Sequence, residues 1–327
     1  MKKLFLNIAI LGFLALSTVW LLSRRGDISY NDYNYLAAII DKNNLLDTVK
    51  SPRIIFVGAS NIAFGIDSEE IEDAFHIPVI NMGLHGNLGF DFILNEVKYN
   101  LKKGDIIILA IEFYLDEFDY PTISYLLNVY PQAEQYVERD AYYYKEKLKF
   151  EFAKAQLARK RLFNIFFGKI LNLKEAKLIA ESDLNLFDTT IYSRNKFNSN
   201  GDVISHLDKP SLKDIRGRIQ IARKDYSGRI DKMNEFAEFS ESKGAKVFYT
   251  YPCYPETEFI RNKGPIMDLD KKLSRELKMP VIASPTEFIF PDSLFFDTVY
   301  HLNKEGRELR TIRMIEILKE KVFNAKN

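Results

Sequence analysis

Three segments of the chain carry residue types that together could perform nucleophilic acyl chemistry. Ser60 follows an apolar run at residues 54–57, and a serine at a strand-to-helix turn is exposed beside backbone N–H groups that can hold an oxyanion. The turn at residues 83–89 contains glycines, which let backbone N–H groups approach a ligand closely. Asp297 and His301 precede a C-terminal helical stretch and could supply a base and the carboxylate that orients it.

These segments must meet in space, and the pattern of predicted elements shows how they can. Short apolar runs alternate with amphipathic stretches, which predicts an α/β fold in three layers, a doubly wound parallel sheet covered by helices on both faces. Reactive groups in such a sheet gather beyond the carboxyl ends of the strands. The predicted strands are residues 54–57, 78–81, 106–111, 245–250 and 280–283, and the predicted helices are residues 68–75, 90–101, 215–243, 268–277 and 304–321.

The strand rhythm stops between about residues 120 and 214, which predicts a mainly helical insertion within an α/β domain of residues 50–327. Residues 145–177 hold ten Lys or Arg against three Glu, interleaved with Leu, Phe and Ile. Such a basic, apolar-striped helix could lie on an anionic membrane surface. An inserted helical hairpin that covers the sheet is the favoured interpretation, because amphipathic helices mostly serve packing.

An apolar run over residues 4–22 predicts an N-terminal transmembrane helix within an anchor of residues 1–25. At about 1.5 Å per residue the run is roughly 28 Å long, close to the hydrocarbon core of about 30 Å. The Ser-Arg-Arg sequence that follows does not look like a cleavage site, so we expect the anchor to be retained. Two basic residues flank each side, and the free amino terminus favours an N-terminus in the cytoplasm. We therefore expect a single-pass protein of the cell membrane whose α/β domain lies outside the cytoplasm.

The composition of the 327 residues disfavours several classes of protein. Lys plus Arg number 46 and Asp plus Glu 45, a formal net charge of +1 that argues against a general nucleic-acid binder. Four histidines and one cysteine, Cys253, leave little for a zinc site and exclude an internal disulfide. A dinucleotide-binding protein is disfavoured because no G-x-G-x-x-G follows the first predicted strand. We expect neither a metal nor an organic cofactor.

The order of a serine after the first strand, glycines after the second and Asp…His before the last helix resembles the SGNH (GDSL-like) hydrolase superfamily. Residues 57–67 (Val-Gly-Ala-Ser-Asn-Ile-Ala-Phe-Gly-Ile-Asp) and 301–306 (His-Leu-Asn-Lys-Glu-Gly) carry the resemblance, which covers roughly residues 53–111 and 245–321. The chain looks most like the membrane-anchored branch associated with O-acylation of bacterial cell-surface polymers, as in the alginate-acetylation and D-alanyl-transfer proteins.

The resemblance implies a role for each residue of the candidate site. Ser60 would be the nucleophile, His301 the base and Asp297 the acid that orients the imidazole, and the oxyanion would be held by the backbone N–H of Ser60 and by Gly86. The family usually places its acid three residues before the histidine, where this chain has Thr298. Asp297 stands four residues before His301, so the assignment of the acid depends on slack in the loop.

Four further residues could contact the substrate. The family's third block usually ends in Gly-x-Asn-Asp, whereas the third predicted strand here runs into Glu112, whose ionised carboxylate would repel an oxyanion unless it is turned away or has another role. Asn61 could cap a helix or donate to substrate, and His85 could touch substrate or pack within its turn. Tyr251 could stack on a sugar, although it also suits an ordinary covering loop.

These features predict a membrane-anchored serine acyl esterase or O-acyltransferase that acts on a cell-envelope glycan through an acyl-enzyme on Ser60. Its partners would be an acylated glycan or another acyl donor, and could include a membrane-bound acyltransferase. The alternative is a catalytically degenerate protein of the same fold that binds glycan or partner proteins in an envelope assembly complex. The missing asparagine of the third block favours this alternative, and the retained Ser60, Asp297 and His301 favour the enzyme.

Overall fold

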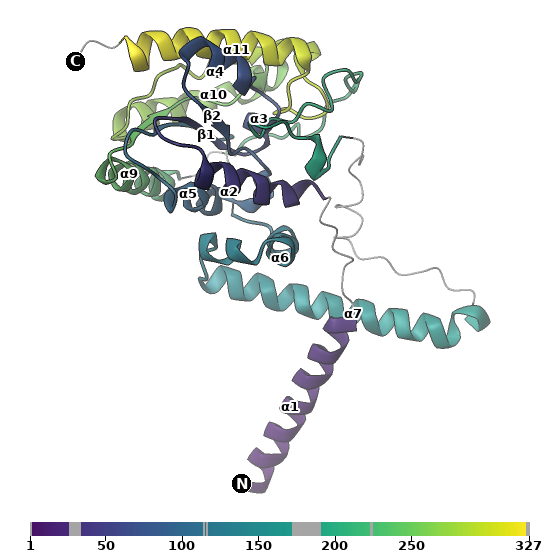
Figure 1. Cartoon of the computed structure of the whole chain (residues 1–327). Coiled ribbons are helices and arrows are strands. Elements are labelled where there is room, and N and C mark those ends of the chain that lie inside the picture. Colours follow the sequence, from purple (N-terminus) through teal and green to yellow (C-terminus); the bar gives the residue numbers. More distant parts are fainter. Residues whose placement is uncertain are drawn as a thin grey trace.

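A four-stranded parallel sheet forms the centre of the computed structural model. The strands are β1 (Ile54–Gly58), β2 (Val79–Asn81), β3 (Ile106–Ala110) and β4 (Lys246–Tyr249). They lie in the order β2-β1-β3-β4 (Figure 1). The α/β class and the parallel sheet are therefore confirmed. The structure describes residues 2–25, 34–113, 115, 117–171, 191–222 and 225–324.

β1 lies in the middle of this sheet, between β2 and β3, and all of it is buried. Burial on both faces explains its unbroken apolar sequence. Gly58, the last residue of β1, lies opposite Ala110 of β3, so close that a Cβ at position 58 would be 2.5 Å from the Ala110 carbonyl oxygen. Only glycine fits there, and the chain turns directly afterwards toward Ser60.

Helices cover both faces of the sheet. The four that do so are α4 (Ser68–Phe75), α5 (Phe90–Lys98), α9 (Ser227–Ser242) and α11 (Lys304–Leu318). α4 and α11 pack together over one face, and α5 and α9 pack together over the other (Figure 1). The Asp67 and Asn303 side chains cap α4 and α11, because each accepts a hydrogen bond from a backbone N–H in the first turn. The predicted three-layer arrangement is thus observed.

The predicted helix over residues 215–243 is shorter in the structure, where α9 begins only at Ser227. Within the predicted range, Arg216 instead forms an isolated parallel bridge with Thr298. The side chain of Arg216 is directed to the candidate site by this pairing, as described below.

The C-terminal half contains one longer helix and one shorter strand than predicted. α10 (Glu256–Glu276) begins well before the predicted helix at residues 268–277. The predicted strand at residues 280–283 is reduced to a single parallel bridge between Val281 and Tyr249. This bridge continues the sheet beyond β4 by one contact.

The α/β domain begins earlier than the predicted boundary at residue 50. A short 3₁₀ helix, η1 (Tyr35–Ala37), leads into α2 (Ala38–Thr48). Leu36 and Ile39 are buried in the same apolar cluster as Phe64. The described part of the domain therefore starts at residue 34.

The predicted insertion is mainly helical over its described residues 120–171, whereas residues 191–214 contain a single 3₁₀ turn at residues 194–196, isolated bridges and turns. It contains α6 (Tyr120–Val129), the 3₁₀ helix η3 (Pro131–Tyr136) and α7 (Ala141–Leu171). Tyr143 and Phe150 of α7 pack against Tyr120 of α6, so one face of the long basic helix serves packing. Residues 172–177 of the predicted basic stretch lie outside the described residues.

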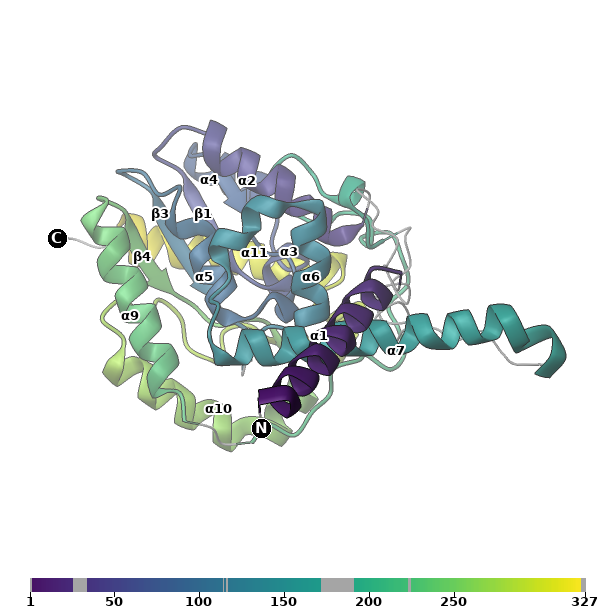
Figure 2. The same ribbon diagram turned by 90° about the horizontal axis from the view of Figure 1, so that it is seen from below.

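α1 (Lys2–Arg25) contains the predicted span over residues 4–22; it contacts α7 and extends away from the α/β domain (Figures 1 and 2). Large apolar side chains along it, such as Phe5, Leu11 and Phe13, are exposed. Among the residues that the structure describes, no helix combines the length and the apolar character needed to cross a membrane. Side chains of the predicted span that lie outside the described set are Leu4, Leu16, Val19 and Leu22.

A second small sheet and several single-turn helices complete the described part of the chain. They are β5 (Tyr254–Pro255), β6 (Ile289–Phe290), η4 (Arg194–Lys196), η5 (Asp292–Leu294) and η6 (Lys319–Phe323). β5 and β6 pair in parallel beyond β4 in the sequence, with Tyr254 opposite Ile289.

Candidate active site

Ser60 lies where the fold predicts a reactive group, just beyond the carboxyl end of β1. It is the first residue of α3 (Ser60–Ala63), and a sharp turn at Ala59 separates the helix from the strand. In the described part of the chain, the backbone N–H of Ser60 makes no hydrogen bond with another backbone group outside the regular elements. This N–H is therefore available to a ligand.

Asp297 and His301 form a buried pair. His301 Nδ1 lies 2.8 Å from Asp297 Oδ1, and both side chains are nearly inaccessible. The four-residue spacing thus brings the carboxylate to the imidazole as well as the usual three-residue spacing could. Because Nδ1 is engaged, Nε2 is the nitrogen left to exchange a proton with a nucleophile.

Two residues that the sequence did not single out hold the carboxylate of this pair. The Tyr192 hydroxyl donates to Asp297 Oδ2 at 2.5 Å, and Arg216 Nη2 donates to the same oxygen at 2.8 Å. Burial opposes the charge of Asp297, but the hydrogen bond and charge of His301, the Tyr192 hydroxyl and the nearby Arg216 outweigh it and lower the pKa of Asp297 to about 2. Asp297 is therefore ionised at any physiological pH.

Phe64 connects His301 to α3, the helix that begins at Ser60. Its ring stacks on the His301 imidazole, with centroids 4.0 Å apart and planes inclined by 7°. Its backbone N–H donates to the Ser60 carbonyl oxygen at 3.0 Å. No direct hydrogen bond joins the Ser60 and His301 side chains among the described residues. Catalytic hydrogen bonds are often long or unformed before substrate binds, so Ser60 and His301 can still act together.

The Ser60 hydroxyl instead donates to Glu112, the residue in the place of the expected asparagine. Ser60 Oγ lies 3.2 Å from Glu112 Oε1, and the Asn61 N–H donates to the same oxygen at 3.0 Å. Burial raises the pKa of Glu112 above its ordinary value, although the Asn61 N–H, the nearby His301 and the Ser60 hydroxyl act in the opposite direction. The carboxyl is thus turned toward the nucleophile and not away from it.

Gly86 faces the same carboxyl from the loop after β2, at the start of η2 (Gly86–Leu88). A Cβ at position 86 would be 3.3 Å from Glu112 Oε2. The loop is held from both sides: Asn81 Oδ1 accepts from the Gly83 N–H at 2.9 Å, and the Tyr35 hydroxyl donates to the Leu84 carbonyl at 2.8 Å. Glu112 therefore lies between Ser60 and Gly86, with one carboxyl oxygen toward each.

The structure does not support substrate contacts by Asn61 or Tyr251. Asn61 is fully buried; its side chain donates to the Ala110 carbonyl at 3.0 Å, and its own carbonyl accepts from Arg310 at 2.6 Å. Tyr251 is also fully buried, and its hydroxyl donates to Asp270 at 2.7 Å. Each side chain uses its polar atoms within the protein, and a substrate contact by either residue stays a prediction.

His85 is a neutral imidazole at the rim of the same loop. Burial of the ring and the nearby His301 lower the pKa of His85 to about 4. Its Nδ1 accepts a hydrogen bond from the Asn87 N–H at 3.0 Å, and its ring packs edge-on against Tyr35. A contact with substrate stays a prediction for this residue.

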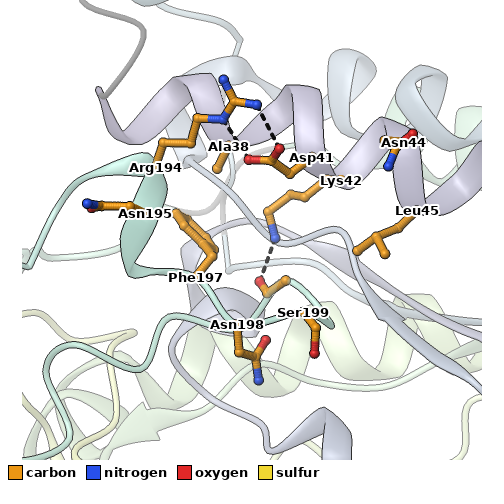
Figure 3. A pocket seen from close by; sticks show the side chains of 11 residues that line it. Ala38, Asp41, Lys42, Asn44, Leu45, Arg194, Asn195, Phe197, Asn198 and Ser199 are labelled. Atoms are coloured by element: carbon orange, nitrogen blue, oxygen red, sulfur yellow. Dashed lines mark hydrogen bonds and ion pairs between the residues drawn. The ribbon is translucent and has the colours of Figure 1, made fainter.

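A separate cavity of about 660 Å³ lies between α2 and the segment that contains η4 (Figure 3). Arg194 and Asp41 form an ion pair at its rim, and the Lys42 Nζ is buried below, where it donates to the carbonyls of Asn81 and Gly201. None of the residues that line this cavity belongs to the Ser60–His301 site. The cavity therefore lies apart from the candidate reactive groups.

No protein-family model matches the chain, and no curated protein shows significant similarity to its sequence. The site must therefore be interpreted from its own geometry.

Proposed function

We propose that the protein is a serine acyl esterase or O-acyltransferase of the SGNH type that acts on a cell-envelope glycan. The proposal is supported above all by the Asp297–His301 pair, which a stacked ring connects to the helix that begins at Ser60. An ionised carboxylate on Nδ1 orients the imidazole and stabilises its charged form, which is what a serine nucleophile requires of its base.

In the proposed reaction, Ser60 Oγ attacks the acyl carbonyl carbon while its proton passes to His301 Nε2. The C–O bond of the ester then breaks, and His301 returns the proton to the leaving alcohol, so that an acyl-Ser60 remains. Water or a sugar hydroxyl attacks this acyl-enzyme, again giving its proton to His301, and the cycle closes when Ser60 leaves with that proton. Hydrolysis and transfer differ only in which hydroxyl enters.

The negative oxygen formed at each attack needs hydrogen-bond donors at the site. The backbone N–H groups of Ser60 and Gly86 are the proposed donors, because the two residues lie on either side of the Glu112 carboxyl. Neither makes a backbone hydrogen bond outside the regular elements in the described part of the chain. Preorganised donors of this kind are usually the largest electrostatic contribution to acyl transfer.

We also propose that α1 attaches the domain to a membrane, with the α/β domain outside the cytoplasm. Support comes from its exposed large apolar side chains, which exist along most of the helix, and from the basic residues that flank the apolar run. No described α1 residue belongs to either apolar core of the domain, which leaves these side chains for another apolar environment.

One observation favours the alternative, a degenerate protein that binds glycan or a partner. The Ser60 hydroxyl donates to Glu112 and not to His301, so the nucleophile must rotate before it can react.

Labelling with a fluorophosphonate probe decides between the two. We expect the probe to modify Ser60 covalently, to fail on Ser60→Ala, and to modify Ser242→Ala normally, since Ser242 is exposed on α9. Wild-type protein should also hydrolyse an aryl acetate. Absence of labelling and hydrolysis in folded wild-type protein would favour the binding protein.

A further inference from the structure

Glu112 lies beside the place where the proposed reaction develops an oxyanion, which a negative charge on its carboxyl would repel. Its Oε1 accepts hydrogen bonds from the Ser60 hydroxyl and the Asn61 N–H, at 3.2 and 3.0 Å. Its Oε2 faces Gly86, one of the two proposed backbone donors to the oxyanion. The carboxyl therefore lies between Ser60 and Gly86, the two residues whose backbone N–H groups are the proposed donors.

The two oxygens of Glu112 have different surroundings. Oε1 is fixed as an acceptor by two donors, and the Asn61 N–H cannot reverse its direction. A proton on this carboxyl must therefore be carried by Oε2, on the side of Gly86. A carboxylic acid so placed is a donor directed at the reacting carbonyl oxygen, as an asparagine amide would be.

The charge state of the carboxyl depends on every group around it. Burial dominates and raises the pKa of Glu112, while neighbouring donors and His301 oppose it. The titratable and charged groups that interact with it are His301, Tyr35, Tyr300, Cys253 and Arg310. Burial also raises the pKa of both tyrosines, and that of Cys253 to about 11, so these groups are neutral at physiological pH.

Resting on the proposed acyl chemistry, we infer that Glu112 is a neutral carboxylic acid that donates a hydrogen bond from Oε2 to the oxyanion. It replaces an amide donor, and the Asn61 N–H fixes which oxygen carries the proton. Deprotonation converts this donor into a repelling charge, so the activity is lost when Glu112 ionises. A carboxylic acid kept neutral in an apolar site can serve as an oxyanion donor in this way.

The test compares Glu112→Gln and Glu112→Ala with wild type in the hydrolysis of an aryl acetate, using the full chain. The glutamine oxygen must face the Asn61 N–H, which places its NH₂ at the position of Oε2. We expect Glu112→Gln to keep kcat within about tenfold of wild type, and Glu112→Ala to lose about 10²–10³ in kcat with little change in KM.

The pH dependence of kcat distinguishes this role from a structural one, because a purely structural Glu112 would leave the shape of the profile unchanged in Glu112→Gln. Wild-type kcat should fall on the alkaline side as Glu112 ionises, whereas Glu112→Gln should lack this fall. An infrared difference spectrum between the two proteins at neutral pH should show a protonated carboxyl band in wild type. Buried Glu96, whose pKa burial raises to about 8, is present in both proteins and cancels.

Loss of activity in Glu112→Gln equal to that in Glu112→Ala would overturn the inference, as would an unchanged alkaline fall or a missing carboxyl band. The infrared result stands even if the alanine variant does not fold. Failure of the proposed function has a different signature, since Ser60→Ala would then hydrolyse the ester as fast as wild type.

Discussion

The imidazole of His301 lies flat against the ring of Phe64, with centroids 4.0 Å apart and planes inclined by 7°. Phe64 follows α3, and its N–H donates to the carbonyl of Ser60. The helix that begins at Ser60 therefore also supports the His301 imidazole. A shift of this helix would displace the imidazole as well. This coupling makes the ring of Phe64 a positioning element for the candidate site.

We expect Phe64→Leu to lower kcat for an aryl acetate by about 10- to 100-fold with little change in KM, because the imidazole loses its planar support. The kinetic comparison should include Phe75→Leu, which removes a ring stacked on Phe323 at the far helices. Equal kcat values for wild type and Phe64→Leu would show that Asp297 alone holds the base.

Ser60→Ala and His301→Ala should each abolish hydrolysis, and the double variant should be no worse than either. Members of a serine–histidine unit act together, and the loss in a well-studied hydrolase is on the order of 10⁶. Steady-state rates of the three variants measure this. Additive losses would mean that Ser60 and His301 do not act as a unit, and turnover equal to wild type would mean that the ester is cleaved elsewhere.

Asp297→Asn should cost about 10⁴ in kcat, because an amide stabilises the wrong imidazole tautomer without removing the base. Tyr192→Phe should cost far less, since His301 and Arg216 still hold the carboxylate. Rates of the two variants at one pH are the measurement. A Tyr192→Phe loss as large as that of Asp297→Asn would assign the tyrosine a part in proton transfer.

The stability of the fold should depend on pH through Glu96. Burial raises the pKa of Glu96 to about 8, against an ordinary value of about 4.3, and the nearby Lys42 and the Asn43 amide only partly offset this. The folded state thus binds the proton more tightly than the unfolded chain. The resulting stability is fully present below about pH 4.3 and is lost as the pH rises to about 8.

In melting curves between pH 5 and pH 9, Glu96→Gln should therefore gain Tm relative to wild type as the pH rises. Glu69→Gln, on the exposed face of α4, serves as the control and should follow wild type. Parallel curves for wild type and Glu96→Gln would show that the buried carboxyl does not titrate in this range.

Full-length protein should sediment with membranes and resist extraction by salt, and deletion of residues 2–25 should release a folded domain. Neither apolar core of the domain includes a described α1 residue, so the deletion exposes mainly the face of α7 that α1 contacts. A reporter fused to the C-terminus should be active only outside the cytoplasm. Full-length protein in the soluble fraction would contradict the proposed attachment.

The fold could be predicted because its signals are local. α4 spans the predicted residues 68–75 and is capped by Asp67, and Gly58 ends the first strand where the close approach of Ala110 leaves no room for a Cβ. The predicted ends of helices and strands were wrong where contacts between residues distant in the sequence determine them. Arg216 is in a stretch with helical periodicity, yet its bridge to Thr298 keeps the backbone extended.

The candidate site was only partly accessible from the sequence, for a similar reason. Ser60, Asp297 and His301 stand next to recognisable strand and helix ends. Tyr192 carries no such signal, because it is one of several tyrosines in the insertion. It becomes significant only because the chain folds back and brings its hydroxyl to Asp297, 105 residues away. Similarly, a glutamate in the sequence suggests an ionised carboxylate, but the protonation of Glu112 depends on its burial in the folded protein.

The hydrogen bond from Arg310 to the Asn61 carbonyl joins residues 249 positions apart and ties the last helix to the nucleophile's own turn. At a synthesis rate of about 5–20 residues per second, roughly 12–50 s pass between the emergence of Ser60 and that of its supporting helix. On the proposed mechanism, the growing chain would carry the nucleophile without its base during that interval. We therefore expect a C-terminal truncation that removes His301 to be inactive and not merely weak.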